Sequence, residues 1–301
     1  MDHAADTLLL ITAARRQEED RYYTCDFFNL ESEELRDLRQ SCFKATGKKP
    51  ADAGCRRVMF SWMLRLVSFF HMSQETVVHA MDYLDRYLPT KAGQKALVHR
   101  NEFQLTAICC LYISVKIHSS TAVSPKFLEQ LSSREYTVTQ LEEMELKILQ
   151  ALEWRVQGPT TDFFLQKYLE LIPSHLVDNP TLDEVYDLAK DQTEVALGEY
   201  CYVTVNKSTI AYAALLNALE ALDIDGTWIA RYIAEAAHID YGSDYNQEIQ
   251  MTLQHDYYLH HSALNGSPSS YGGKTSSASS KEKQRVSCHK TSPRSVTSQA
   301  A

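Results

Sequence analysis

The chain has 301 residues, of which 44% are hydrophobic and 23% are charged, and its formal net charge is −9. The last 40 residues hold six Lys or Arg and one Glu, so the preceding 261 residues carry a formal charge of −14. This composition excludes a wholly disordered chain, and the acidic body argues against broad binding to nucleic acid and favours a protein partner or a small ligand.

Helical periodicity recurs along the first half of the chain, and strand-like alternation is nearly absent. We expect a flexible N-terminus at 1–24, followed by a short helix near 30–44. Pro89 and Pro125 then mark the end of one helix and the start of another. The expected helices of this first set are 53–70, 74–88, 101–118, 125–132 and 138–152.

A second set of helices follows the breaker Gly158-Pro159. Each set contains one helix that is apolar nearly all round, at 105–117 and at 208–222. A helix without a polar face must be surrounded by other helices, so each set predicts a bundle around its third helix. We therefore predict an all-α protein with tandem domains at 25–157 and 158–260. The expected helices of the second set are 160–172, 181–203, 207–222, 226–237 and 243–260.

From residue 261 to 301 the chain is rich in Ser, Gly and Lys and has few large apolar residues. Such a segment buries too little surface to offset its ordering entropy, so a disordered C-terminal tail is predicted. Ser267 and Ser292 each precede a proline and are candidate phosphorylation sites for proline-directed kinases. The stretch KEKQR at 281–285 is a short nuclear-import candidate.

Motifs of catalysis and cofactor binding are absent from the sequence: there is no GxSxG, no glycine-rich phosphate loop and no HExxH. The seven cysteines include no CxxC pair, which indicates reduced thiols in an intracellular protein rather than zinc or disulfides. The longest apolar run, 105–117, is too short to span a bilayer, and no signal peptide is evident. We expect no catalytic residues, metal or cofactor, no nucleic-acid or membrane partner, and a location in the nucleus and/or cytoplasm.

Three stretches of the first set, at 55–90, 103–120 and 131–156, resemble the cyclin box, and the stretch 159–169 resembles the entry to the second cyclin fold. The second set is similar only in helical pattern, chiefly over 197–222. The resemblance implies tandem five-helix cyclin folds, the second of them divergent. The SWML, MELKILQALEW and TTDFF stretches look most like D-type cyclins.

The resemblance also implies roles for individual residues. Arg56 and Asp85 would form an ion pair that fixes how the first two helices of the box cross. Lys116 and Glu145 would hold backbone groups at the end of a kinase helix through charge-assisted hydrogen bonds. Apolar positions that would pack on the same kinase helix are Ile113, Leu149, Trp154 and Val156.

Two departures from the cyclin pattern bear on binding. The acids that follow the third-helix lysine in typical cyclins are replaced by His118 and Ser119. A groove that recruits substrates or inhibitors with a basic-x-Leu motif would include Arg65 in place of an acid, and a cation there would repel the motif. Matches to the floor of this groove are Cys55, Met59, Trp62 and Gln104.

These features predict a non-enzymatic regulatory subunit that binds and activates a cyclin-dependent kinase in cell-cycle control, with a leaning to G1 or G1/S. Alternatives are a cyclin-fold protein in nutrient signalling or transcription, including a factor of the TFIIB type, and an unrelated helical scaffold or an unrecognised enzyme. The TFIIB alternative would need a zinc ribbon and basic DNA-facing helices, and the chain has no CxxC pair and an acidic body.

Overall fold

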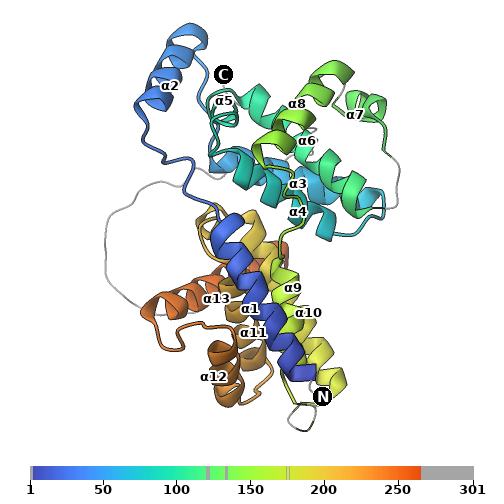
Figure 1. The fold of residues 1–301 in the computed structure, drawn as a ribbon, viewed down its shortest axis with the longest axis vertical. Coiled ribbons are helices and arrows are strands. Elements are labelled where there is room, and N and C mark those ends of the chain that lie inside the picture. The colour runs from blue at the N-terminus through green and yellow to red at the C-terminus, as the bar shows by residue number, and fades with distance from the viewer. Residues whose placement is uncertain (1–2, 120–122, 133–134, 174, 176, 266–301) are drawn as a thin grey trace.

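The computed structural model describes residues 3–119, 123–132, 135–173, 175 and 177–265. All regular elements in these ranges are helices, so the all-α prediction is confirmed. They form two successive helical units, and Figure 1 shows one unit stacked above the other. No described helix combines the length and the apolar composition that crossing a bilayer requires.

The first unit is built around α6 (Arg100–His118), in which every residue from Phe103 to Val115 is buried. This is the apolar helix that the sequence predicts at the centre of the bundle. Helices α3, α4, α5 and α8 all pack against it, and α7 packs on α8. The bounds of these helices are α3 (Ala53–Phe69), α4 (Glu75–Tyr87), α5 (Gln94–Val98), α7 (Pro125–Leu131) and α8 (Val138–Ala151).

The second unit surrounds α11 (Lys207–Ala221), which is buried from Ser208 to Leu215. Helices α9, α10 and α13 pack against it. The elements around α11 are α9 (Thr161–Glu170), α10 (Asn179–Gly198), the 3-10 turn η1 (Tyr200–Tyr202), α12 (Thr227–Ala236) and α13 (Asp244–Asn265). Helix α13 continues past the expected domain end at 260, so residues 261–265 are helical and not part of a disordered tail at 261–301 as predicted. The remainder of that predicted tail, 266–301, lies outside the described residues.

The N-terminus differs from the expectation of a flexible segment at 1–24, because His3–Arg21 form helix α1. Ile11 and Ala14 belong to the buried core of the second unit, and Figure 1 shows α1 lying across that unit. Thr7 and Glu18 are also buried, so one side of the helix is inward-facing at helical spacing. The packing partners of α1 come from the far half of the chain, which is why the local pattern did not predict an ordered helix.

Helix α2 (Glu33–Thr46) matches the short helix expected near 30–44. Ser32 caps its first turn by accepting a hydrogen bond from the Leu35 amide. Gly47 ends the helix in the left-handed conformation at φ 65°, which costs glycine little. Helix α2 contacts α5 at the edge of the first unit.

Candidate functional site

Arg56 on α3 and Asp85 on α4 form a buried, two-pronged ion pair. Arg56 donates from Nε to Asp85 Oδ1 at 2.9 Å and from Nη2 to Oδ2 at 2.7 Å. Its Nη1 donates to the carbonyls of Leu197 at 2.9 Å and Gly198 at 3.3 Å, at the end of α10. The residue Arg56 is 2% exposed. The Arg56 guanidinium therefore links the crossing of α3 and α4, which was predicted, to α10 of the second unit. The sequence did not indicate this second link.

Asp82 lies one turn before Asp85 and makes a second charged link between the units. It accepts a hydrogen bond from Arg86 Nη1 at 2.8 Å and is paired with Lys207 at the start of α11. Burial opposes ionisation of Asp82, but the attraction of Lys207 and Arg86 outweighs it and lowers the pKa of this carboxyl. Arg86 also donates from Nη2 to the Arg155 carbonyl at 2.8 Å. Asp82 thus holds α4, the inter-unit connection and α11 together.

Glu18 of α1 caps α11 from a distant part of the chain. Its carboxylate accepts hydrogen bonds from the Ser208 amide at 3.2 Å and the Ser208 hydroxyl at 2.7 Å. Asn206, at the cap position itself, makes no side-chain cap bond. Burial raises the pKa of Glu18, although the bonds from Ser208 act in the opposite direction. The carboxylate satisfies amides at the positive end of α11 that would otherwise lack partners.

His118, one of the two departures from the cyclin pattern, stacks on His79. The two rings lie 3.7 Å apart at 4° to each other, and Tyr83 Oη lies 3.0 Å from His118 Nε2. Burial and His118 lower the pKa of His79 to about 4, and burial also lowers that of His118. An imidazole ring does not carry the negative charge of a carboxylate, so His118 cannot replace the charge of an acid at this position.

Lys116 and Glu145, predicted from separate helices, form an ion pair between α6 and α8. Their side chains are 40% and 15% exposed, so the pair lies at the surface rather than in the core. The Lys116 ammonium also lies 4.5 Å from the centre of the Tyr112 ring. The structure therefore places the two predicted ionic residues side by side.

Each of these helices repeats the same pattern around its charged residue. On α6, Ile113 lies three positions before Lys116 and four positions before Ile117. On α8, Leu149 lies three positions after Leu146 and four positions after Glu145. Positions three or four apart on a helix share a face. Ile113 and Leu149 are buried at 1% and 8% exposure, whereas Ile117 and Leu146 are 37% and 48% exposed. Ile117 and Leu146 are the exposed sequence neighbours of the ion pair, and the exposed Trp154 follows α8; we refer to Lys116, Ile117, Glu145, Leu146 and Trp154 together as the α6–α8 face.

Trp154 is the aromatic residue of the α6–α8 face, and it is 62% exposed. Glu153 and Trp154 both have positive φ, 52° and 59°, and the Trp154 amide donates to the Leu149 carbonyl at 2.9 Å. Two such residues in sequence are costly outside glycine, so this turn presents the indole by a strained backbone. Val156, predicted with it, is partly buried against the core. Its carbonyl accepts a hydrogen bond from Tyr83 at 2.6 Å.

The sequence prediction did not include Ile117 and Leu146: Ile117 belongs to the nearly apolar helix α6, from which exposure cannot be read, and Leu146 is an exposed apolar residue among the polar side chains of α8. The only available signal was their adjacency to the predicted ionic residues. Ile113 and Leu149, which were predicted as contact residues, lie under the face and support it.

The four residues predicted for a substrate-docking groove lie in the core of the first unit. Their exposures are 4% for Cys55, 0% for Met59, 7% for Trp62 and 0% for Gln104, whereas Arg65 is exposed. Both amide atoms of Gln104 lack a hydrogen-bond partner among the described residues.

The segment that precedes α2 packs into the same core. Phe27 is fully buried there, and the Phe28 ring lies 6.4 Å from that of Phe103 and 4.8 Å from that of Tyr200. No open groove is therefore formed by these four side chains in this structure. Ser267 and Ser292, the candidate phosphorylation sites, lie outside the described residues. Within the described residues, no group of three metal-binding side chains occurs.

The first unit is similar to a known family. Residues 26–157 match the family model described as "Cyclin, N-terminal domain". Cyclin-A1-4 of Oryza sativa subsp. japonica is 26% identical over 176 residues, which cover 58% of this chain and 48% of the relative. The G2/mitotic-specific cyclin-B1 of Caenorhabditis elegans is 26% identical over 192 residues, covering 63% and 51%. The chain thus spans about half the length of the curated relatives it matches.

Solved structures support the fold of both units. A viral cyclin from Herpesvirus saimiri has a TM-score of 0.53 at 20% identity, covering 74% of this chain and 96% of the other. The CAK complex of Chaetomium thermophilum bound to ATP-gamma-S includes a chain with a TM-score of 0.51 at 15% identity, covering 84% and 83%. Because both matches extend well beyond residue 157, the likeness includes the second helical unit.

Proposed function

We propose that this chain is a non-catalytic regulatory subunit that binds and activates a cyclin-dependent protein kinase in cell-cycle control. The match of residues 26–157 to the cyclin N-terminal domain supports this assignment. The observation that carries it is the α6–α8 face, where Lys116 and Glu145 lie together beside exposed apolar side chains. A cation, an anion and an aromatic anchor suit the end of another protein's helix, which offers unpaired backbone groups and apolar side chains.

The proposed mechanism is a shift of the kinase between two conformations. Phosphoryl transfer by protein kinases requires a lysine–glutamate pair whose glutamate lies on a mobile helix. A partner that binds the active position of that helix more tightly than the inactive one favours the active state. Lys116 and Glu145 would act by holding the helix end, and this chain would contribute no group to the reacting phosphate.

The type of cyclin and its location are finer proposals. The sequence leaning towards D-type, G1 or G1/S cyclins rests on three short stretches, whereas the relatives named above are A- and B-type cyclins. A G1 or G1/S role therefore stays a prediction, as does a location in the nucleus and/or cytoplasm. Recruitment of substrates or inhibitors at Cys55, Met59, Trp62 and Gln104 would require these buried side chains to become accessible.

A pull-down from the source cells with kinase identification tests the proposal. The variant Lys116→Ala/Glu145→Ala should lose the kinase, because it removes both polar contacts of the face. Lys95→Ala/Glu102→Ala is the matched control, since it removes another surface ion pair of the same unit, with 3.2 Å between its charged atoms. Equal kinase recovery with both variants would contradict the site, and absence of any kinase from the wild-type pull-down would contradict the function.

A further inference from the structure

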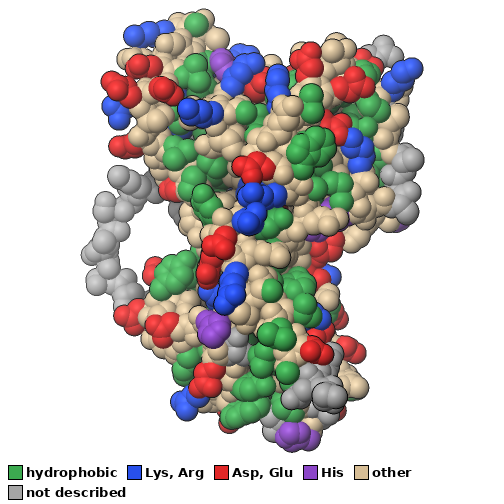
Figure 2. All heavy atoms as spheres, viewed as in Figure 1, with side chains coloured by type: hydrophobic (Ala, Val, Ile, Leu, Met, Phe, Trp, Pro, Cys, Tyr) green, Lys and Arg blue, Asp and Glu red, His purple; other side chains and the backbone are tan. Residues whose placement is uncertain are grey.

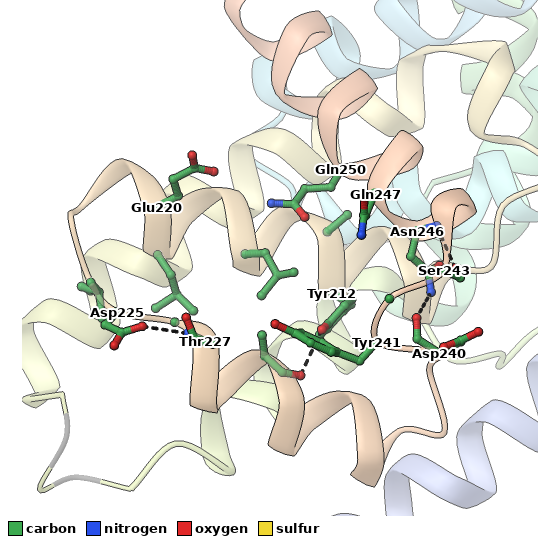
Figure 3. Close-up of a pocket in the computed structure, with 17 residues that line it drawn as sticks. Tyr212, Glu220, Asp225, Thr227, Asp240, Tyr241, Ser243, Asn246, Gln247 and Gln250 are labelled. Atoms are coloured by element: carbon green, nitrogen blue, oxygen red, sulfur yellow. Dashed lines mark hydrogen bonds between the residues drawn. The ribbon is translucent and has the colours of Figure 1, made fainter.

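A cavity of about 560 Å³ lies in the second unit, between the end of α11, the start of α12 and the start of α13. Leu216, Leu219 and Ile224 are among the apolar residues that line it. Figure 3 shows Glu220 and Asp225 at one end and Asp240 at the other. Among the described residues that line the cavity there is no Lys or Arg. The cavity therefore combines an apolar wall with an acidic rim.

Two tyrosines lie between the acidic ends of the cavity, as Figure 3 shows. The Tyr212 hydroxyl donates to the Ala230 carbonyl at 3.0 Å, so its hydrogen-bonding capacity is used within the protein. Tyr241 is 41% exposed, and the guanidinium carbon of Arg231 lies 5.7 Å from its ring centre. One cation thus already lies near this ring, and aromatic faces attract cations through their negative electrostatic potential.

The apolar wall, the acidic rim and the tyrosine rings together indicate which ligand chemistry would fit the cavity. Lysine and arginine side chains pair an aliphatic stem with a cationic head, so the stem can contact the apolar wall while the head stays at the acidic rim. An anionic ligand would face three carboxylates of the lining, whereas Arg231, the cation near the Tyr241 ring, is not among the lining residues. A wholly apolar ligand would leave the rim unused. The cavity is therefore suited to basic side chains of a peptide.

We propose that the occupant is the basic C-terminal segment of this same chain, residues 274–294. Six Lys or Arg and one Glu lie in 266–301, opposite in sign to the remainder of the chain. Residues of the first turns of α13 line the cavity, and this helix of 22 residues extends for about 33 Å before the segment begins. The residues from 266 to 281 can span about 50 Å when extended, which is enough for Lys281 to return to the rim.

Tethering makes weak contacts sufficient for this docking. Exposed ion pairs contribute little individually. A segment linked to its site by a short chain has an effective concentration on the order of millimolar, however, so weak contacts in the same molecule can populate the bound state. The proposal does not depend on kinase binding, which involves a different unit of the chain.

Photo-crosslinking in the full-length protein tests the proposal. A benzophenone amino acid replaces Gln247, which lines the cavity, or Gln166 on α9, which does not. We expect crosslinks within one chain from position 247 to residues 274–294, identified by mass spectrometry, and none from position 166. Crosslinks only between two chains would overturn the same-chain occupant, and absence of crosslinks to this segment would overturn the proposal altogether.

Charge exchange tests the electrostatic basis. Glu220→Lys/Asp240→Lys should lower the crosslink yield about fivefold or more, because it replaces two attractions by repulsions. Asp183→Lys/Glu184→Lys on α10 changes the net charge equally at residues that do not line the cavity, and it should leave the yield unchanged. Lys281→Glu/Lys283→Glu combined with the rim variant should restore the yield. Equal yields for the two double variants, or failure of this rescue, would refute recognition by charge.

Discussion

Replacing Asp85 by alanine should destabilise the protein far more than removing a surface charge. The change leaves the Arg56 guanidinium in a site where the residue is 2% exposed, without its counter-charge and without bonds of 2.9 and 2.7 Å. Removing one partner of a buried ion pair costs about 3–5 kcal/mol. Urea unfolding followed by far-UV circular dichroism should show this loss as a lower midpoint.

The neighbouring residue offers a matched control. Arg57 pairs with Glu199 across the same boundary, but the two side chains are 61% and 31% exposed. Arg57→Ala should therefore change the free energy of unfolding by less than about 1 kcal/mol. If Asp85→Ala proved no more destabilising than Arg57→Ala, the inference that the Arg56–Asp85 pair organises the structure would be refuted.

A double variant separates the two roles of Arg56. Arg56→Met/Asp85→Leu removes both charges, and replacement of a buried pair by apolar side chains is often neutral or stabilising. Here it also takes a donor from the carbonyls of Leu197 and Gly198. A buried carbonyl that loses its donor costs about 1–3 kcal/mol, so the double variant should remain destabilised. Wild-type stability would show that the bonds to α10 contribute nothing.

Three further outcomes are expected. Trp154→Ala should leave the urea midpoint nearly unchanged, because the side chain is 62% exposed, yet weaken kinase binding by about 2 kcal/mol in calorimetry. Burial, and next Asp162, raise the pKa of Glu75 to about 7, so wild-type stability falls as pH rises from 4.5 through 7. Glu75→Gln should therefore gain stability relative to wild type at pH 8 but not at pH 4.5; equal gains would contradict this. The pKa of His79 is lowered to about 4 in the folded protein. The free energy of unfolding should therefore fall by about 3 kcal/mol as pH falls from 6.5 to 4. The His79→Phe variant should lose less stability over this pH range. Identical dependence of stability on pH in the variant and the wild type would exclude the buried His79 ring as the cause of the loss.

The central helices could be predicted from sequence because burial leaves a local signature. A helix that is apolar on every side, as α6 is from Phe103 to Val115, can only be a core helix. Helix α1 lacked such a signature, since its inward side includes Thr7 and Glu18. Glu18 finds its partner Ser208 190 positions away. No local pattern encodes that contact.

The candidate site could likewise be predicted from sequence only in part. The resemblance placed Lys116 and Glu145 at matching positions, and the structure brings them together. It could not separate the buried Ile113 from the exposed Ile117, because both are isoleucines of one apolar helix. Nor could it show that Phe27, which precedes α2, shares a core with Met59 of α3. Composition identifies apolar positions, whereas their accessibility depends on which segment covers them.

The contacts at the boundary between the two units could not be predicted from the apolar pattern of the sequence. Most apolar residues belong to one of two separate cores, although Val203 from the second unit is buried in the first. Across the boundary, Arg56 donates to α10 and Lys207 pairs with Asp82. Figure 2 shows acidic and basic side chains gathered where the units meet. Apolar contact is non-directional, whereas hydrogen bonds require defined distances and angles. The charged groups therefore add directional contacts at a boundary that apolar side chains such as Val203 also cross.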